Sequence, residues 1–292
     1  MTRLTKLCIN DGKIEDMKEV LDESPDAAKM KDDRHRTALF YYCEHGSSTE
    51  VLRWLIEKNP AAARDREAHG HSHSSERQTT TTRRRTATKT TRRATTTSSA
   101  VSCSYLNLQG RTPLHYLCDN KKLGHSVHRD GNMLKVLVEA CPDAAQALAK
   151  LPKENGIEEA TPLHILCEKS YATAPMVRAL LQCCPDAAFA KITIPVTGIG
   201  LNQVYAKHGD TSLHILCRKP EITVEMLQCV VDVSPMAAME QQRGDTPLHV
   251  LCERGDVTAE MVSCLVEACP PAAGERVRNA FAAETTFPLH HQ

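Results

Sequence analysis

The chain is short of aromatic residues, of net charge and of long apolar runs. Aromatic residues make up 4% of its 292 residues, and 36 Lys and Arg balance 36 Asp and Glu. No apolar run approaches the roughly 20 residues that a membrane-spanning helix needs, and residues 1–11 lack the apolar centre of a signal peptide. From these absences we expect an intracellular protein, cytoplasmic or nuclear, that is neither secreted nor membrane-bound.

Catalytic signatures are also missing from the sequence. We find no nucleophile motif, phosphate-binding loop or pair of acids. Gly198-Ile199-Gly200 lacks the third glycine and the strand-turn-helix context of a dinucleotide-binding turn. We therefore expect a chain that is not an enzyme and that uses no cofactor, metal or small-molecule substrate.

A heptapeptide recurs along the chain. Thr112-Pro113-Leu114-His115 leads to Leu117-Cys118, and near-identical segments begin at Thr161 and Thr246. Weaker copies begin at Thr2, Thr37 and Thr211. The shortest period, from Thr2 to Thr37 and again from Thr211 to Thr246, is 35 residues. The longer intervals contain insertions, and six copies in all predict a repeat architecture, which favours binding over catalysis.

A proline with an alanine pair behind it follows each copy, at Pro25, Pro60, Pro142, Pro185, Pro235 and Pro270. Apolar residues precede each proline at helical spacing, as Met176, Val177, Leu180 and Leu181 precede Pro185. Threonine caps helices and proline suits their first position, whereas the residue before a proline avoids the helical region. Each unit is therefore predicted to be helix, turn, helix and connector.

These units resemble the ankyrin repeat, which shares the Thr-Pro-Leu-His opening, the paired apolar positions on a second helix and the Gly-Asp or Gly-Arg before the next copy. Leu-Cys and Pro-x-Ala-Ala depart from the usual ankyrin pattern and indicate a divergent subfamily. The resemblance covers nearly the whole chain and implies an all-α helix-turn-helix solenoid of about six units. It also implies a structural role for four histidines, which would hydrogen-bond the threonine and the turn backbone: His115, His164, His214 and His249.

His-x-x-Cys, found in four of the units, places two potential zinc ligands one helical turn apart. Stacked repeats would set successive pairs along a line, whereas a closed zinc site needs four ligands at one point. We therefore expect no metal site. The six cysteines at the repeated position are predicted to be small core residues: Cys8, Cys43, Cys118, Cys167, Cys217 and Cys252.

The domain organisation follows from the repeats. We assign residues 1–66 to repeats 1 and 2, 105–285 to repeats 3 to 6, and 286–292 to an incomplete further copy. Residues 67–104 form a Thr- and Arg-rich insertion, which we expect to be disordered because its centre has no aliphatic residue larger than alanine. A functional basic segment and a low-complexity tract without function remain alternatives for it. Residues 192–204 are predicted to form a small hairpin.

Two functions of different classes fit the sequence. The first is a non-catalytic scaffold or adaptor that binds a protein partner on the concave face implied by the resemblance. The alternative is a nucleic-acid or acidic-surface binder that acts through the basic insertion, with binding that weakens steeply with salt.

Candidate partner-binding residues come from two positions in each unit. The residue after each histidine position is apolar and either forms an exposed stripe or packs between neighbouring first helices: Tyr41, Tyr116, Ile165, Ile215 and Val250. The connector tips add charged candidates: Arg111, Glu158, Asp210, Arg243 and Asp245.

Overall fold

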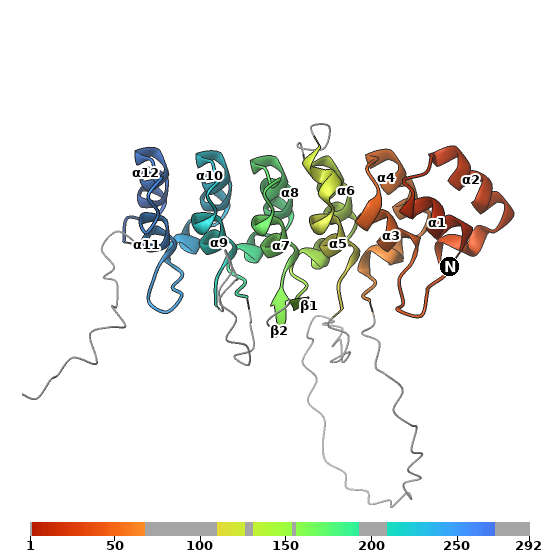
Figure 1. Ribbon diagram of the computed structural model, residues 1–292, viewed down its shortest axis with the longest axis horizontal. Coiled ribbons are helices and arrows are strands. Elements are labelled where there is room, and N and C mark those ends of the chain that lie inside the picture. The colour runs from red at the N-terminus through yellow and green to blue at the C-terminus, as the bar shows by residue number, and fades with distance from the viewer. Residues whose placement is uncertain (1, 68–109, 126–130, 154–155, 193–208, 272–292) are drawn as a thin grey trace, which may run out of the picture.

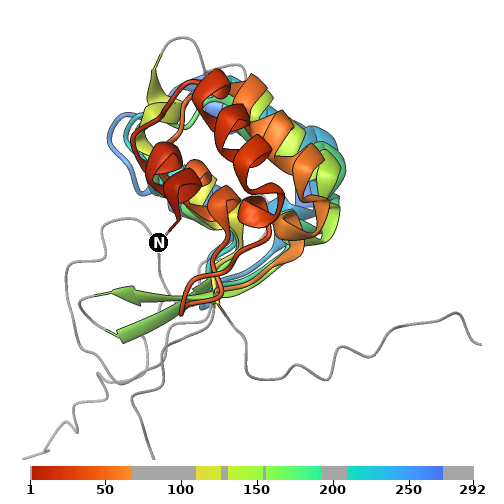
Figure 2. The same ribbon diagram turned by 90° about the vertical axis from the view of Figure 1, so that its right-hand side faces the viewer.

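The computed structural model describes residues 2–67, 110–125, 131–153, 156–192 and 209–271. Paired helices stack side by side in two layers, one of first helices and one of second helices (Figures 1 and 2). The pairs are α1 (Arg3–Ile9) with α2 (Ile14–Glu23), α3 (Ala38–His45) with α4 (Thr49–Lys58), α5 (Pro113–Asp119) with α6 (Asn132–Ala140), α7 (Pro162–Glu168) with α8 (Ala174–Cys183), α9 (Ser212–Arg218) with α10 (Val224–Val233), and α11 (Pro247–Cys252) with α12 (Ala259–Ala268). The predicted all-α, ankyrin-type solenoid is confirmed.

Each first helix begins directly after the threonine of the heptapeptide. In α5, α7, α9 and α11 the threonine side chain and the histidine three residues later form a reciprocal capping box. The box satisfies backbone N–H groups that a helix start would otherwise leave without partners. In α1, where no histidine is present, Thr2 accepts from the backbone N–H of Thr5 instead. The repeated motif is thus a helix-start signal.

The prolines end the second helices as predicted. The residue before each proline has φ between −149° and −142° and ψ between 75° and 83°, outside the helical region. In the first five units the proline opens a short 3₁₀ turn that contains the alanine pair: η1 (Pro25–Ala28), η2 (Pro60–Arg64), η5 (Pro142–Ala145), η6 (Pro185–Ala188) and η7 (Pro235–Met239). The alanine pair of each of these turns is buried and belongs to the core.

One continuous apolar core runs through the stack. Consecutive first helices contact one another from α1 to α11, and consecutive second helices do so from α4 to α12. Five of the six repeated cysteines are buried as predicted, but Cys252 in α11 is exposed. The prediction was wrong there because no further helix pair covers α11 in the described residues.

The connectors close in the same way in successive units, although they differ in length. The backbone N–H of Asp32 donates to the Arg36 carbonyl at 3.0 Å, and that of Glu67 donates to the Arg111 carbonyl at 3.0 Å across a much longer segment. Gly110 is required beside this closure, because a Cβ there would lie 1.6 Å from the Glu67 oxygen. The later closures join Ala149 to Ala160, Ile192 to Asp210 and Gln242 to Asp245.

Strands β1 (Ala149–Lys153) and β2 (Gly156–Ala160) extend one connector into an antiparallel hairpin that projects from the stack (Figures 1 and 2). The sequence did not predict this hairpin, since β1 contains a proline and few strand-forming residues. The hairpin predicted at 192–204 lies almost wholly outside the described residues. So do the insertion beyond Glu67 and the incomplete repeat at 286–292, and the proposed domain limits stay a prediction. No helix in the described ranges is long and apolar enough to cross a membrane.

Candidate functional site

The connectors lie along one edge of the stack, next to the N-terminal ends of the first helices. We call this the tip edge and define it by its described residues: 30–36, 64–67 with 110–111, 147–153 with 156–160, 189–192 with 209–210, and 239–245. In Figure 1 it is the side toward which β1 and β2 project. All ten predicted partner-binding residues belong to the tip edge or to the adjoining first helices.

The five apolar candidates are buried rather than exposed. Tyr41 is 9% exposed, Tyr116 7%, Ile165 4%, Ile215 0% and Val250 4%. The expectation of an exposed apolar stripe is therefore corrected in favour of its alternative, in which these side chains fill the space between neighbouring first helices. The reason is the close approach of those helices, which leaves their apolar side chains little contact with solvent.

Tyr41 is held by a polar cluster at the first tip. Its hydroxyl donates to Asp32 Oδ2 at 2.6 Å and accepts from Arg36 Nη2 at 2.7 Å, and the Arg36 guanidinium lies 4.5 Å from the ring centroid. Burial alone would raise the pKa of Asp32, but the hydrogen bonds from Tyr41 and Arg36 lower it below its ordinary value. The cluster lines a small cleft with Met30, Lys31, Thr2 and Thr5.

The next unit repeats this arrangement. The Arg111 guanidinium lies 4.4 Å from the ring centroid of Tyr116, whose hydroxyl donates to Glu67 Oε2 at 2.6 Å. Burial, followed by the bond to Glu67, raises the pKa of Tyr116. Arg111 also pairs with Asp119 at 2.7 Å, so it is only 19% exposed. The arginine five residues before each tyrosine is a signal for this pair that can be read in the sequence, although it was not among the predicted features.

The remaining charged candidates differ in accessibility. Asp210 is fully buried and pairs with Arg218 through both carboxylate oxygens. Asp245 is half-buried, and its carbonyl oxygen lies 3.2 Å from His214 Nε2. Arg243 is exposed at a left-handed backbone position, with φ of 56°. Glu158 lies opposite Leu151 on β2, and its side chain is outside the described structure.

Exposed apolar side chains on the tip edge were not among the predicted residues. Met30 is 55% exposed, Leu148 38% and Phe189 36%. Each lies four to six residues after the proline of its unit, where the chain turns toward the tip. This sequence position could identify the exposed apolar residues only if the connector were already known to face solvent. Arg34, whose side chain is 60% exposed, adds a charge to the first tip.

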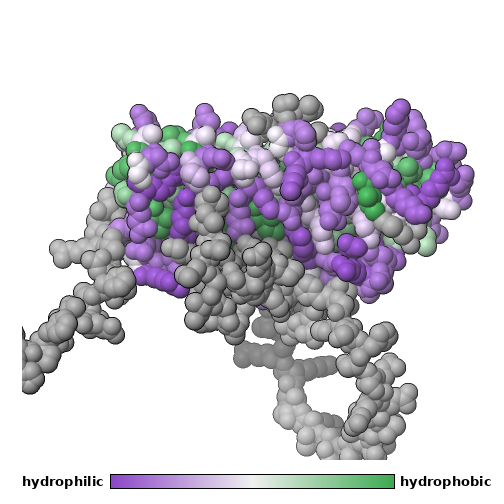
Figure 3. All heavy atoms as spheres, viewed as in Figure 1, coloured by the Kyte–Doolittle hydropathy of each residue, from purple (hydrophilic) through white to green (hydrophobic). Residues whose placement is uncertain are grey.

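The described surface is largely hydrophilic on the face that Figure 3 shows, and its apolar patches there are small and separate. On this surface, exposed apolar side chains therefore occur singly among charged ones rather than as one large patch.

His115, His164 and His214 are buried and His249 is half-buried, and all four bond the threonine as the resemblance implied. In each, Nδ1 lies 2.8 Å from the threonine hydroxyl and within 3.3 Å of the threonine backbone nitrogen, which donates to it. His164 Nε2 lies 3.0 Å from the Ala190 carbonyl of the next connector, which assigns the proton to Nε2. Burial lowers the pKa of His115 to about 3 and that of His164 to about 4.

No group of three or more potential metal ligands converges in the described ranges. The His-x-x-Cys pairs instead lie on successive first helices, α5, α7, α9 and α11. Their histidines are engaged in capping bonds, which is the structural role that we expected for them.

A second row of inter-repeat bonds lies at the other end of the first helices. Asn120 Nδ2 donates to the carbonyls of Cys43 at 3.0 Å and Gly46 at 2.8 Å. Lys219 Nζ donates to the Lys169 carbonyl, and Arg254 Nη1 donates to the Cys217 carbonyl at 3.3 Å. Donors, and cations above all, stabilise helix C-termini, where carbonyls lack partners. In these three units the donor stands two residues after the repeated cysteine, at Asn120, Lys219 and Arg254.

Comparisons with known proteins were made by sequence and by structure. No family model matches the chain, and no curated protein matches it. Among solved structures, the human ASB11 ankyrin repeat domain is similar with a TM-score of 0.47 and 15% identity, over 92% of this chain and 84% of that one. An ankyrin repeat protein from Leishmania major is similar with a TM-score of 0.33 and 14% identity, over 94% of this chain and 60% of that one.

The fold assignment rests on the repeats themselves. Four helix pairs open with a threonine and histidine capping box, and five connectors close by the same backbone pairing at one edge. Two continuous layers of helices result. The chain therefore has the ankyrin-type repeat fold.

Proposed function

We propose that this chain is a non-catalytic scaffold whose tip edge binds a protein partner. The observation that carries the proposal is the row of connectors closed alike on one side of the stack, with exposed apolar residues in between. A flat, extended row of this kind suits a protein surface, because it offers many separated contacts rather than one enclosed cavity. Solenoids characteristically present such extended binding surfaces.

The accessible residues of the tip edge define the contact that we propose. Phe189 and Leu148 supply apolar anchors in neighbouring connectors, and Arg34 and Arg243 supply charges toward the two ends. Of the ten sequence candidates, Arg243 is the best placed for direct contact. The buried tyrosines contribute indirectly, because they hold Arg36 and Arg111 in place beneath the tips.

Inside the first helices, the polar groups are largely used in holding the repeats together. The threonines and histidines bond one another, and the buried Asp210 is paired with Arg218. Groups committed to such bonds are not available to a substrate, which supports a binding role rather than catalysis. We propose that this role is intracellular, because five of the repeated cysteines serve as small core residues, for which reduced thiols suffice.

The alternative function, binding of nucleic acid or an acidic surface, depends on a basic segment outside the described residues. No described feature favours it. Its expected signature is a steep loss of binding with salt, because released counterions would drive the association. Salt dependence therefore separates the two functions.

The test is affinity capture from cell extract at low and moderate salt, with three forms of the full chain. They are the natural sequence, the double variant Leu148→Asp with Phe189→Asp, and the control Met236→Asp. Met236 is 61% exposed in η7, off the tip edge, so its substitution tests nonspecific effects of a new charge. We expect partners retained by the control and lost by the double variant. Identical partners for all three forms, or partners lost only with salt, would contradict the proposal.

A further inference from the structure

The second helices pack in a close row from α4 to α12, and α2 stands apart from that row (Figure 1). The residue six positions before the closing proline faces the preceding second helix. It is small or medium-sized in the later units: Val136, Ala179, Cys229 and Cys264. Cys229 Sγ, for example, lies 3.5 Å from the Ala174 carbonyl of α8. Small residues at this position allow neighbouring helices to approach closely.

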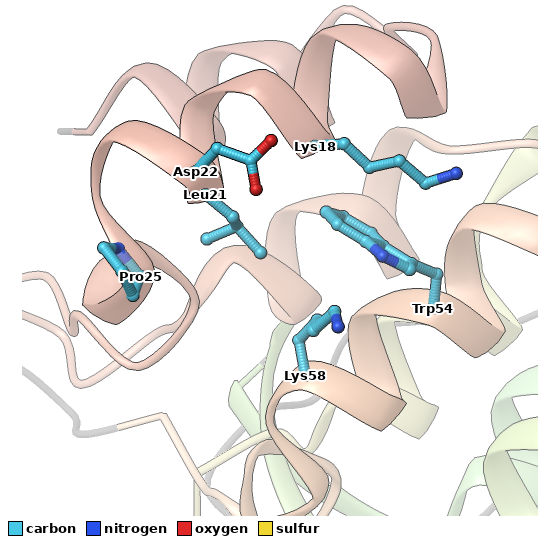
Figure 4. A pocket seen from close by; sticks show the side chains of 6 residues that line it. All are labelled: Lys18, Leu21, Asp22, Pro25, Trp54 and Lys58. Carbon is cyan, nitrogen blue, oxygen red and sulfur yellow. The ribbon is translucent and has the colours of Figure 1, made fainter.

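In the second unit this position is occupied by Trp54, the only tryptophan of the chain. Its indole is larger than the cysteine and alanine side chains of the later units, and it lines an open groove of about 570 Å³ between α2 and α4. Figure 4 shows its lining, with Lys18, Leu21, Asp22 and Pro25 on one side and Trp54 and Lys58 on the other.

The groove combines an apolar floor with charged walls. Leu21 and Trp54 form the floor, each 9% exposed. The charged side chains Lys18, Asp22 and Lys58 have no ion pair or hydrogen bond within the described structure. Elsewhere on α2, by contrast, Glu19 and Glu23 are engaged by Arg3, at 3.8 Å and 3.1 Å. Two lysines against one aspartate give the lining a small excess of positive charge.

We propose that this groove docks an acidic amphipathic segment of a partner protein. Apolar side chains of the segment contact Trp54 and Leu21, and its carboxylates pair with Lys18 and Lys58. The carboxylate of Asp22 accepts a backbone N–H of the segment. Aromatic anchors such as Trp54 supply much of the affinity in such contacts, and the charged rim supplies the selectivity. The site lies in the layer of second helices, so it is independent of the proposed function of the tip edge.

The test uses the intrinsic fluorescence of the full chain, because emission from the single tryptophan reports on the groove alone. The probe is a synthetic amphipathic peptide with leucine and phenylalanine on one helical face and glutamate elsewhere. The same peptide with lysine in place of glutamate is the control ligand. Calorimetry follows the same titrations independently of the indole. We expect saturable binding of the acidic peptide with a blue shift of the emission, and no binding of the basic one.

Variants establish where the peptide binds. We expect the double variant Lys18→Glu with Lys58→Glu to bind the acidic peptide at least about fivefold more weakly, because two ion pairs at the rim of the groove are lost. The control Lys29→Glu, at an exposed lysine outside the groove, leaves the affinity unchanged. Circular dichroism checks that each variant is folded.

Four results would overturn the proposal. These are absence of binding by both methods, equal binding of the acidic and basic peptides, full binding by the double variant, and an emission shift that depends on protein concentration alone. The last would mean that a second copy of the chain fills the groove. We expect the tip-edge variants to leave this titration unchanged, so the two proposals can be refuted independently.

Discussion

Phe40 lies beside Thr37 in the position that histidine takes beside threonine in four later units. The phenyl ring cannot bond the threonine, and Thr37 Oγ1 is buried without a hydrogen-bond partner in the described structure. In the fifth unit, the equivalent Thr211 Oγ1 lies 2.8 Å from His214 Nδ1. The same residue type at the same repeat position is therefore satisfied in one unit and not in the other.

We expect Thr37→Val to be neutral or to raise the free energy of unfolding by up to about 1 kcal/mol, because it removes a buried hydroxyl that has no partner. Thr211→Val is the matched control and should lower the free energy of unfolding by about 1 to 2 kcal/mol, because it breaks a capping box. Urea unfolding of both variants measures the difference. Equal losses for the two would show that Thr37 is satisfied in solution.

Acid should destabilise the stack through its buried histidines. Burial depresses their pKa in the folded chain, to about 3 for His115 and about 4 for His164, whereas the ordinary value is 6.5. The unfolded chain therefore binds more protons below pH 6.5. The contribution of the neutral buried histidines to the free energy of unfolding is therefore complete above pH 6.5, and it is lost as the pH falls toward about 4.

The measurement is urea unfolding at a series of pH values between neutral and about 4. His164→Gln keeps the capping geometry without a titrating group and should have a shallower slope, although it is less stable at neutral pH. A variant as steep as the natural chain would show that other groups cause the acid sensitivity.

Thiol reactivity should follow position in the stack. Burial raises the pKa of Cys8 and of Cys167 to about 12, so these thiols are neither ionised nor accessible at neutral pH. Cys183 and Cys252 are exposed. Among the described cysteines, brief alkylation of the native chain followed by peptide mass spectrometry should label Cys183 and Cys252 first. Early labelling of Cys167 would indicate that the stack opens locally.

Lys219 should contribute to stability although it carries a charge. It is 3% exposed, and its ammonium caps the carbonyl of Lys169 in the preceding unit. Lys219→Met keeps the apolar stem and removes the donor, so we expect a loss of about 1 to 3 kcal/mol. The exposed Lys29→Met should change the free energy of unfolding by less than about 0.5 kcal/mol. Thermal unfolding compares them, and equal effects would contradict a role in joining the units.

The sequence predicted the features that local rules decide. Threonine before proline starts a helix in this chain, and the residue before the closing proline does not continue one. In the fourth unit, Thr161, Pro185 and the apolar spacing between them therefore predicted the helix pair. The histidine role came from the resemblance and agrees with the bonds found at His164.

Features that depend on distances between units could not be predicted. Whether Ile215 faces solvent or a neighbouring helix is decided by how closely the first helices approach, and that distance is not encoded in one repeat. The groove beside Trp54 has the same origin, since it lies between helices of two different units. The β1 and β2 hairpin was missed because its strands are poor in the residues that usually mark strands.

Because the connectors close by the same backbone bond, each tip can carry a loop of a different length. Asp32 and Arg36 are joined across a few residues, and Glu67 and Arg111 across many, yet the helix pairs on either side keep the same stacking. Loop length is thus separated from stack stability, and lengthening a loop that is already closed costs little entropy. The chain could therefore serve as a display framework, in which a foreign peptide inserted between Gln242 and Asp245 is presented without redesign of the helices beneath it.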